Sequence, residues 1–388
     1  MRRTPLTRSA ALSELGGGDV YLKLETEQLT GSFKVRGALN ALAALPEDVR
    51  RRGVVASSAG NHGMGVAFAA RELGVPATIF VPTAAPKVKR DGIAALGATL
   101  DTSQPHYDAA MAAAKAFAAE RGVTFINPCL GDALLAGQGT VALEILADLP
   151  DVASIVVPVG GGGLLGGVAS IVRRIAPDVR IHGAQSENTA AMARSVAAGR
   201  VVAIPVAPTL ADGLAGQIDD EALDIGMNGL DEIVTLTEDE IAQTIAWLAT
   251  THDVKAEGAG AVGVGAAWLG KLAKLATPAA VVVSGGNIDE SRLSAILSTE
   301  GGGLSALGSR QPRAESREPR AFPTTRGLRS AWRSSALVSC DPPKSPGLAA
   351  RDASRARRSG PSSGPLDALS ARTLRSAAAA LAAQRAAR

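Results

Sequence analysis

Up to about residue 300, short β-branched apolar runs alternate with longer amphipathic stretches rich in Ala and Leu. The short runs predict strands, because β-branched residues pack well on a pleated surface, and apolar positions three and four apart predict helices in the longer stretches. The predicted strands are Val20–Leu24, Val54–Ser57, Ala77–Val81, Thr99–Asp101, Val123–Ile126, Ser154–Val159, Arg180–Gln185, Glu232–Leu236 and Ala280–Ser284. The helical pattern is clear in Gly63–Leu73, Tyr107–Arg121, Gly137–Leu146 and Glu238–Thr250.

This alternation of strands and helices is typical of an α/β fold, in which a parallel sheet carries helices on both faces. In such sheets ligands bind beyond the carboxyl ends of the strands. The functional residues are therefore expected in loops that follow strands.

The pattern ends after Gly303. Residues 304–388 contain no Ile, Tyr or Met and one Val, among scattered Pro, Ser, Ala and Arg. A segment of this composition cannot bury enough apolar surface to offset the entropy that it loses on ordering, so we predict that 304–388 is a disordered, low-complexity tail. A basic arm that binds RNA or an acidic partner is the alternative interpretation.

The distribution of charge divides the chain at the same place. Residues 304–388 hold 15 Arg and one Lys against five acidic residues, a net charge of +11, whereas the whole chain of 388 residues carries +3. Residues 1–303 therefore carry −8. An acidic body argues against a nucleic-acid groove in the folded part.

Targeting and metal-binding signals are missing from the sequence. No apolar run is long enough to cross a membrane without Gly or charge interruptions, and the first residues lack the apolar segment of a secretory signal. Cys129 and Cys340 lie far apart in the sequence and form no metal-type cluster. We therefore expect a cytoplasmic protein with no membrane partner and no bound metal.

The strongest local motif is "SIVVPVGGGGLLGG", where the strand Ser154–Val159 leads into Gly160, Gly161, Gly162 and Gly163 and then into an apolar helix. Consecutive glycines can present backbone N–H groups at a helix N-terminus, which suits a phosphate. Two other interpretations stay open. Gly161, Gly163 and Gly166 match the dinucleotide pattern G-x-G-x-x-G, and glycines also permit close packing of a helix on a strand.

Two further strands end in small-residue loops. "VVASSAGNHG" places Ser58, Ala59, Gly60, Asn61 and His62 after the strand Val54–Ser57, where backbone N–H groups could approach a carboxylate or phosphate. A capped strand-to-helix turn, with Asn61 as the helix cap, is the alternative. "AAVVVSGGNID" places Ser284 at a strand end, where its hydroxyl could bind a ligand nitrogen or belong to an ordinary turn.

The stretch "GSFKVRG" places Lys34 beside Phe33, between two glycines. A buried ammonium loses its hydration and becomes an amine nucleophile, whereas an exposed lysine at a helix start has no such role. Pyridoxal phosphate would use all of these features: a lysine for a Schiff base, a cradle for its phosphate, and partners for its phenolic oxygen and its pyridine nitrogen. A nicotinamide dinucleotide would give Lys34 and Ser284 no necessary function.

The motifs "GSFKVRGA", "SSAGNHG", "VPVGGGGL", "PTLADGL" and "SGGNID" occur in the order found in the serine/threonine dehydratase family, which the chain resembles over nearly all of residues 3–300. These are pyridoxal-phosphate enzymes of fold type II, and serine racemases are among them. The resemblance implies two open, twisted, mostly parallel sheets with helices on both faces. It also implies a large catalytic domain (1–52 and 131–303), a small substrate-loop domain (53–130) and a homodimer.

The resemblance also implies a role for each motif. Lys34 would form the Schiff base, Phe33 would lie against the cofactor ring, and Asn61 would bind the phenolic oxygen. The glycines 160–163 would hold the phosphate, and Ser284 would meet the pyridine nitrogen. The substrate carboxylate would bind in the loop of Ser58, Ala59, Gly60 and His62.

The implied activity is β-elimination, in which L-threonine or L-serine loses water and ammonia and leaves a 2-oxo acid. Another 3-hydroxy amino acid, such as hydroxyaspartate or a substrate of hydroxyectoine breakdown, is the alternative, and an NAD-dependent oxidoreductase is a more distant one. Serine racemases carry a serine where this chain has Ala59, and acidic metal ligands where it has Gln185 and Ala191. Efficient racemisation and a divalent metal there are therefore not expected.

Overall fold

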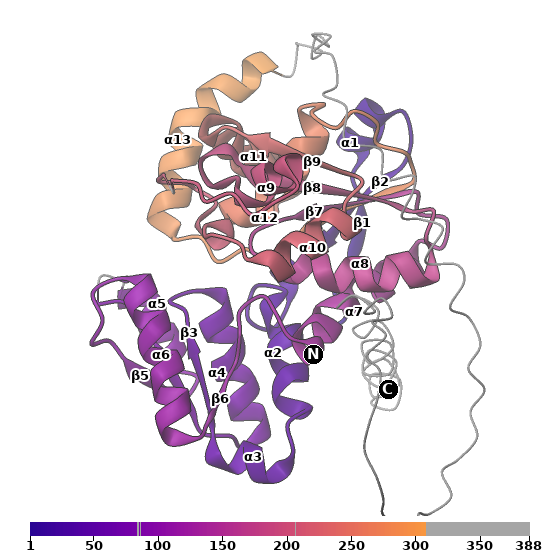
Figure 1. The fold of residues 1–388 in the computed structure, drawn as a ribbon. Coiled ribbons are helices and arrows are strands. Elements are labelled where there is room, and N and C mark those ends of the chain that lie inside the picture. Colours follow the sequence, from indigo (N-terminus) through magenta and orange to yellow (C-terminus); the bar gives the residue numbers. More distant parts are fainter. Residues whose placement is uncertain (84, 86, 206, 308–388) are drawn as a thin grey trace, which may run out of the picture. The chain divides into compact units, whose positions relative to one another are not determined.

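The computed structural model describes residues 1–307 apart from 84, 86 and 206, and these form two sheets with surrounding helices (Figure 1). The six-stranded sheet has the order β1 (Leu6–Arg8), β2 (Val20–Leu24), β10 (Ala279–Val283), β7 (Ser154–Pro158), β8 (Arg180–Ser186), β9 (Glu232–Leu236). The four-stranded sheet has the order β5 (Thr99–Asp101), β4 (Ala77–Phe80), β3 (Val54–Ser57), β6 (Thr124–Phe125).

Every strand pair is parallel except β1 with β2, which is antiparallel. The α-helices are α1 (Ala10–Gly16), α2 (Lys34–Ala43), α3 (Glu47–Arg52), α4 (Asn61–Leu73), α5 (Lys87–Ala94), α6 (Tyr107–Arg121), α7 (Asp132–Asp148), α8 (Gly163–Ile175), α9 (Ala191–Ala198), α10 (Asp220–Gly229), α11 (Glu238–His252), α12 (Gly258–Trp268) and α13 (Glu290–Leu307). The predicted α/β fold with two mostly parallel sheets is confirmed.

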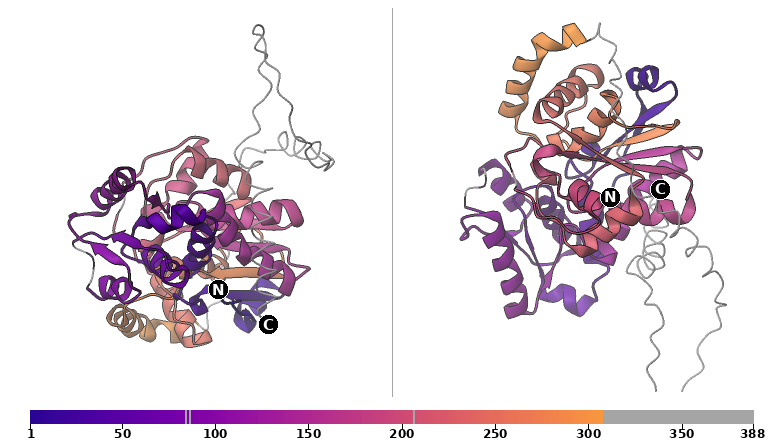
Figure 2. Two further views of the ribbon diagram at one scale, coloured as in Figure 1. Left: turned by 90° about the horizontal axis from the view of Figure 1, so that it is seen from below. Right: turned by 45° about the horizontal axis from the view of Figure 1, so that its top comes forward.

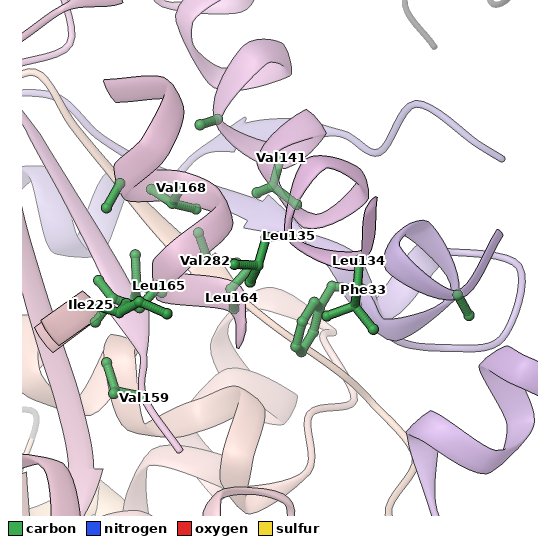
Figure 3. Packing of buried hydrophobic residues seen from close by; sticks show 14 of the residues in the cluster. Phe33, Leu134, Leu135, Val141, Val159, Leu164, Leu165, Val168, Ile225 and Val282 are labelled. Atoms are coloured by element: carbon green, nitrogen blue, oxygen red, sulfur yellow. The ribbon is translucent and has the colours of Figure 1, made fainter. Parts of the chain in front are cut away.

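The central strands are continuous apolar runs because both faces of the six-stranded sheet are buried. In β7, Ile155 and Val157 belong to a first apolar cluster on one face of the sheet, and Val156 belongs to a second cluster on the other face. In β10, Val282 belongs to the first cluster and Val281 to the second. Helices α7, α8 and α10 contribute to the first cluster, and α11 and α12 to the second. Figure 3 shows part of the first cluster, with Leu164, Leu165 and Val168 of α8 near its centre.

Four charged side chains are buried where α2, α7 and β2 meet. Lys23, Glu25, Arg36 and Glu144 are each fully buried, and we call them the buried charge cluster. Arg36 donates to Glu25 at 2.7 Å and to Glu144 at 2.8 Å, and Lys23 donates to Glu144 at 2.7 Å. Burial alone would raise the pKa of Glu144, but its bonds and charge interactions with Arg36 and Lys23 outweigh burial and lower it. Arg36 belongs to α2, so the cluster anchors the helix that begins at Lys34.

Most predicted elements are present with shifted ends. Helix α4 begins at Asn61 rather than Gly63, and α7 begins at Asp132 rather than Gly137. Helix α13 packs against α11 and ends at Leu307 (Figures 1 and 2), while the rest of the predicted tail, 308–388, lies outside the described residues. Among the described residues, no helix is both long enough and apolar enough to span a membrane. The predicted division at residues 52/53 and 130/131 stays a prediction.

Candidate active site

Three of the predicted motifs follow neighbouring strands of one sheet. Strand β10 pairs in parallel with β2 on one side and β7 on the other. The segment after β2 leads to Lys34, the loop after β10 holds Ser284, and the loop after β7 holds Gly160–Gly163. Because the carboxyl ends of parallel strands meet at one edge of a sheet, these motifs lie at a shared edge.

Backbone pairing joins the first two of these loops. The N–H of Phe33 donates to the carbonyl of Ser284 at 3.1 Å, and the N–H of Gly286 donates to the carbonyl of Gly31 at 2.9 Å. Ser32 and Gly285 form an antiparallel bridge between these two bonds. The first residue of α2 is thereby held beside the end of β10.

Lys34 begins α2, as a helix-start lysine would, but its side chain is not free in solvent. The residue is half-buried, and its Nζ donates a hydrogen bond of 2.9 Å to the carbonyl oxygen of Pro128. The same Nζ lies 5.2 Å from the centre of the Phe33 ring. Phe33 is buried in the core cluster, where Figure 3 shows it next to Leu134 of α7.

The segment after Pro128 connects the lysine to the tetraglycine turn. A Cβ added to Gly161 would lie 2.8 Å from the Sγ of Cys129, and one added to Gly163 would lie 3.0 Å from the Cα of Cys129. The side chain of Asn127 fixes this segment, because its Oδ1 accepts from the N–H groups of Cys129 and Leu130 at 2.8 and 2.9 Å. Residues 127–130 had no predicted role, and the dipeptide Asn127-Pro128 was the turn signal that could have indicated them.

The tetraglycine turn packs so closely against the segments of Cys129 and Leu214 that it has no room for side chains. Gly162 has a φ of +89°, a conformation that strains any residue with a Cβ, and a Cβ on Gly160 would lie 3.0 Å from the Cα of Leu214. Helix α8 begins at Gly163, and the first N–H groups of a helix have no acceptor within it. A ligand can therefore come close to the backbone of the turn, where the first N–H groups of α8 can donate to it. The positive potential of the helix N-terminus adds to this, and the combination suits an anion.

Asn61 reaches the shared edge from the other sheet. It does not cap α4, since Gly60 is the N-cap and makes no side-chain cap bond. Instead its Nδ2 donates to Oε1 of Glu257 at 2.6 Å, and its Oδ1 accepts from Asn287 at 2.7 Å. Glu257 precedes α12 and makes no side-chain cap bond to it. Asn287 had no predicted role of its own, because a contact between residues so far apart along the chain leaves no local pattern.

The hydroxyl groups near this edge include unsatisfied ones. Ser284 is buried and donates to the carbonyl of Ala259 over a long 3.3 Å, so its hydroxyl can turn to another partner. The hydroxyl oxygens of Thr30 and Ser32, in the segment that leads to Lys34, are buried and have no hydrogen-bond partner among the described residues. Buried polar groups are usually paired, so these hydroxyls indicate a missing ligand or water.

The loop before α4 holds the remaining predicted residues. Ser58, Ala59 and Gly60 are half-buried, and the N–H of Gly60 donates to the Ser58 hydroxyl at 3.1 Å. His62 is buried, with its Nε2 3.0 Å from the carbonyl of Ile126 and its Nδ1 unpartnered among the described residues. Burial first, and then the charge of Lys34, lower the pKa of His62 to about 3. His62 is therefore neutral at physiological pH, with Nε2 as the donor.

Comparison with known proteins decides between the cofactors that the sequence left open. The family model described as "Pyridoxal-phosphate dependent enzyme" matches residues 1–285. This chain belongs to that family. The dinucleotide interpretation of the glycine motif is thereby set aside, and the cofactor of the enzyme is pyridoxal phosphate.

Relatives and solved structures agree with the family. The chain is 46% identical over 298 residues to an L-threonine ammonia-lyase of Thermotoga maritima, a match that covers 76% of this chain and 74% of the relative. It resembles the structure of maize serine racemase with a TM-score of 0.72 and 31% identity, over 78% of this chain and 94% of that one. It resembles the processed form of threonine deaminase isoform 2 from Solanum lycopersicum equally well, with a TM-score of 0.72 and 31% identity over 77% and 88%.

The residues of this pyridoxal-phosphate enzyme fit the cofactor. The tetraglycine turn, which carries no side chains, matches the phosphate. The Lys34 amine, bonded to Pro128 next to the residue that touches this turn, matches the aldehyde. Buried hydroxyls without partners among the described residues match the polar ring atoms. Gln185, by contrast, accepts a bond from the N–H of Ala193 at 2.9 Å. No group of three His, Cys, Asp or Glu in the described part of the chain could hold a metal ion.

Proposed function

We propose that this protein is an ammonia-lyase that converts L-threonine, L-serine or both into a 2-oxo acid and ammonia. The observation that carries the proposal is the 46% identity, over most of both chains, to a relative named L-threonine ammonia-lyase. The hydrogen bond from Lys34 to the segment that touches the tetraglycine turn supports it, because both ends of one cofactor would be bound there.

Each site residue has a proposed role that follows from its position. Lys34 would bind the aldehyde carbon of the cofactor covalently, and Phe33 would lie against the ring. Gly160–Gly163 bind the phosphate with backbone N–H groups, Asn61 donates to the phenolic oxygen, and Ser284 meets the pyridine nitrogen.

Pyridoxal phosphate, when bound, supplies an electron sink for the bonds at the substrate's α-carbon. The chain supplies the proton transfers. The Nζ of Lys34, released once the substrate's amine has replaced it, would act as the general base that removes the α-proton. The proton that Nζ takes up would balance the one that the β-hydroxyl carries away as water. Hydrolysis of the released enamine returns one water and frees ammonia. L-Threonine therefore gives 2-oxobutanoate and ammonia, with no other reactant consumed.

The loop Ser58–His62 binds the substrate carboxylate in this proposal. It lies at the N-terminal end of α4, where N–H groups and helix potential attract an anion. The neutral ring of His62 adds no charge to this end, so carboxylate binding rests on N–H donors rather than on an ion pair.

The identity of residue 284 favours elimination. A serine hydroxyl, unlike a carboxylate, does not stabilise a protonated pyridine nitrogen. With a serine as its partner the ring would draw less negative charge from the α-carbon, which would favour fast loss of the β-hydroxyl over transamination.

Racemisation is the second candidate, because the chain resembles a serine racemase structure as closely as a threonine deaminase. Ala59 argues against it, since racemases have a serine hydroxyl there to serve the opposite face of the α-carbon. A homodimer and a cytoplasmic location stay predictions, and sedimentation of the purified holoenzyme tests the first of them.

The experiment is a substrate panel. The holoenzyme is given L-threonine, L-serine, L-threo-3-hydroxyaspartate and L-alanine, and 2-oxo acid and ammonia are measured together. We expect equal amounts of both products from threonine or serine and none from alanine, which has no β-hydroxyl to lose. Turnover of hydroxyaspartate alone would replace the proposed substrate, and no product from any of them would refute the lyase.

A further inference from the structure

Asn287 links two parts of the site through one side-chain nitrogen. Its Nδ2 donates to the backbone carbonyl of Thr30 at 2.8 Å and to Oδ1 of Asn61 at 2.7 Å. An amide nitrogen has two N–H groups, so both are used. Asn287 thereby joins the segment that leads to Lys34 with the loop that begins α4.

These bonds determine the orientation of the Asn61 amide. The Thr30 carbonyl can only accept, so the atom of Asn287 that faces it must be nitrogen. The second N–H of that nitrogen needs an acceptor, so the Asn61 atom facing it must be oxygen. The nitrogen of Asn61 then faces Oε1 of Glu257, at 2.6 Å, which is again a donor meeting an acceptor. The three bonds agree on one orientation.

This orientation decides what Asn61 can offer a ligand. One N–H of its Nδ2 is used by Glu257, and its Oδ1 accepts from Asn287. The second N–H of Nδ2 is the group that can donate to a ligand oxygen. If the amide were turned over, an oxygen would occupy the same place and would repel the phenolic oxygen of the cofactor.

The surroundings of Asn287 leave it little freedom to move. Gly31 has a φ of +70°, and a Cβ there would lie 2.4 Å from Oδ1 of Asn287. A Cβ on Gly285 would lie 2.3 Å from Oε1 of Glu257 and 3.2 Å from Nδ2 of Asn61. Two glycines thus make the space in which these polar side chains meet.

We propose that Asn287 is a positioning residue that fixes the Asn61 amide with its N–H group toward the cofactor and ties it to the segment carrying Lys34. The inference rests on the proposed role of Asn61. Two substitutions of Asn287 are expected to differ in their effect on the Asn61 amide. In N287D the new carboxylate has only acceptors to offer Thr30 and Asn61. Asn61 then lies between two carboxylates, the new one and that of Glu257, and neither orientation of its amide is favoured. In N287A, by contrast, Glu257 is left to hold the amide in place.

The experiment compares N287D, N287A and N61A, with N228D as the matched control, because Asn228 is exposed on α10 and gains the same charge. The equilibrium constant for binding pyridoxal phosphate and the absorbance maximum of the bound cofactor are measured, together with the melting temperature. We expect N287D to weaken binding roughly 10- to 100-fold, as loss of one bond to a charged acceptor does, and N287A to weaken it less. We also expect N287D and N61A to shift the absorbance maximum of the bound cofactor in the same direction.

A double-variant cycle completes the test. If Asn287 acts through Asn61, adding N287D or N287A to N61A weakens binding by less than about twofold. Additive losses, or a larger loss for N287A than for the isosteric N287D, would show that Asn287 only fills space and would overturn the inference. Should N287D fail to fold, the cycle with N287A decides. Cofactor binding is measured without substrate, so a wild type that binds pyridoxal phosphate but makes no 2-oxo acid would contradict the proposed reaction and leave this result intact.

Discussion

The Nζ of Lys34 donates a 2.9 Å hydrogen bond to the carbonyl oxygen of Pro128, and the next residue, Cys129, lies against the tetraglycine turn. The Lys34 amine and the tetraglycine turn are therefore separated by the width of one chain segment, although they belong to different loops of the six-stranded sheet. Because the same segment contacts both, a substitution in the glycines should also change the position of the Lys34 amine.

Gly163→Ala tests the cradle. The new Cβ would lie 3.0 Å from the Cα and 3.1 Å from the carbonyl oxygen of Cys129, so backbone atoms must move. We expect the dissociation constant of pyridoxal phosphate to rise about tenfold or more, which is at least about 1.4 kcal/mol. Gly92→Ala is the control, since nothing lies within 4 Å of its added Cβ. Equal affinities for the two variants would show that the turn does not hold the phosphate.

The buried charge cluster tests what anchors α2. Arg36→Met leaves Glu25 and Glu144 buried without their main partner, and removal of one member of a buried ion pair costs about 3–5 kcal/mol. Arg51→Met removes an exposed pair with Glu47 and should change the free energy of unfolding by about 0.5 kcal/mol or less. Urea denaturation of both variants measures the difference. Similar midpoints would mean that the cluster adds nothing to stability.

His62 predicts a loss of stability in acid. Its pKa falls from 6.5 to about 3 in the folded protein, first because of burial and then because of Lys34. Below pH 6.5 the unfolded chain binds a proton at His62 that the folded chain does not, so the free energy of unfolding falls by up to about 1.4 kcal/mol per pH unit until about pH 3.

His62→Gln keeps a donor for the Ile126 carbonyl and removes the titrating group. Between about pH 7.5 and about pH 5 the wild type should lose about 2 kcal/mol more than this variant, as measured by chemical denaturation at both pH values. If both proteins lose the same free energy of unfolding, titratable groups other than His62 cause the loss of stability in acid.

Ala59→Ser tests the choice between elimination and racemisation. The substitution adds a hydroxyl to a half-buried loop position, where the resemblance places the acid of serine racemases. We expect the ratio of D-serine to pyruvate formed from L-serine to rise roughly tenfold or more, because a positioned proton donor is worth at least that. Chiral chromatography measures the ratio, and Ala273→Ser at an exposed position is the control. An unchanged ratio would mean that residue 59 does not set the reaction's outcome.

The part of the site that follows from sequence is the part set by strand order along the chain. Gly160–Gly163 and Ser284 were singled out because each directly follows an apolar strand, and parallel strands bring their carboxyl ends together. Lys34 was singled out by its neighbours Phe33 and the two glycines, and its role came from the family resemblance. The start of α4 was placed two residues late because Asn61 and His62 are polar in a pattern read from apolar positions. Such shifts at element ends come from local backbone geometry that the pattern does not contain.

The contacts that orient the site could not be predicted in this way. Asn61 meets Glu257 and Asn287 across 196 and 226 residues of sequence, and Lys34 meets Pro128 across 94. Hydrogen bonds of this kind depend on how the two sheets pack, and no local spacing records them. Arg36 shows the same limit, since a charged residue is normally assigned to the surface and here it is fully buried.

The proposed reaction depends above all on the covalent attachment of the cofactor to Lys34. Reduction of the holoenzyme with sodium borohydride, followed by proteolysis and mass spectrometry, fixes the cofactor to the lysine that carries it. We expect a phosphopyridoxyl group on the peptide that contains Lys34, and no labelled peptide from Lys34→Ala treated in the same way. A label on another lysine, such as Lys23 or Lys255, or an unlabelled wild type loaded with pyridoxal phosphate, would contradict it.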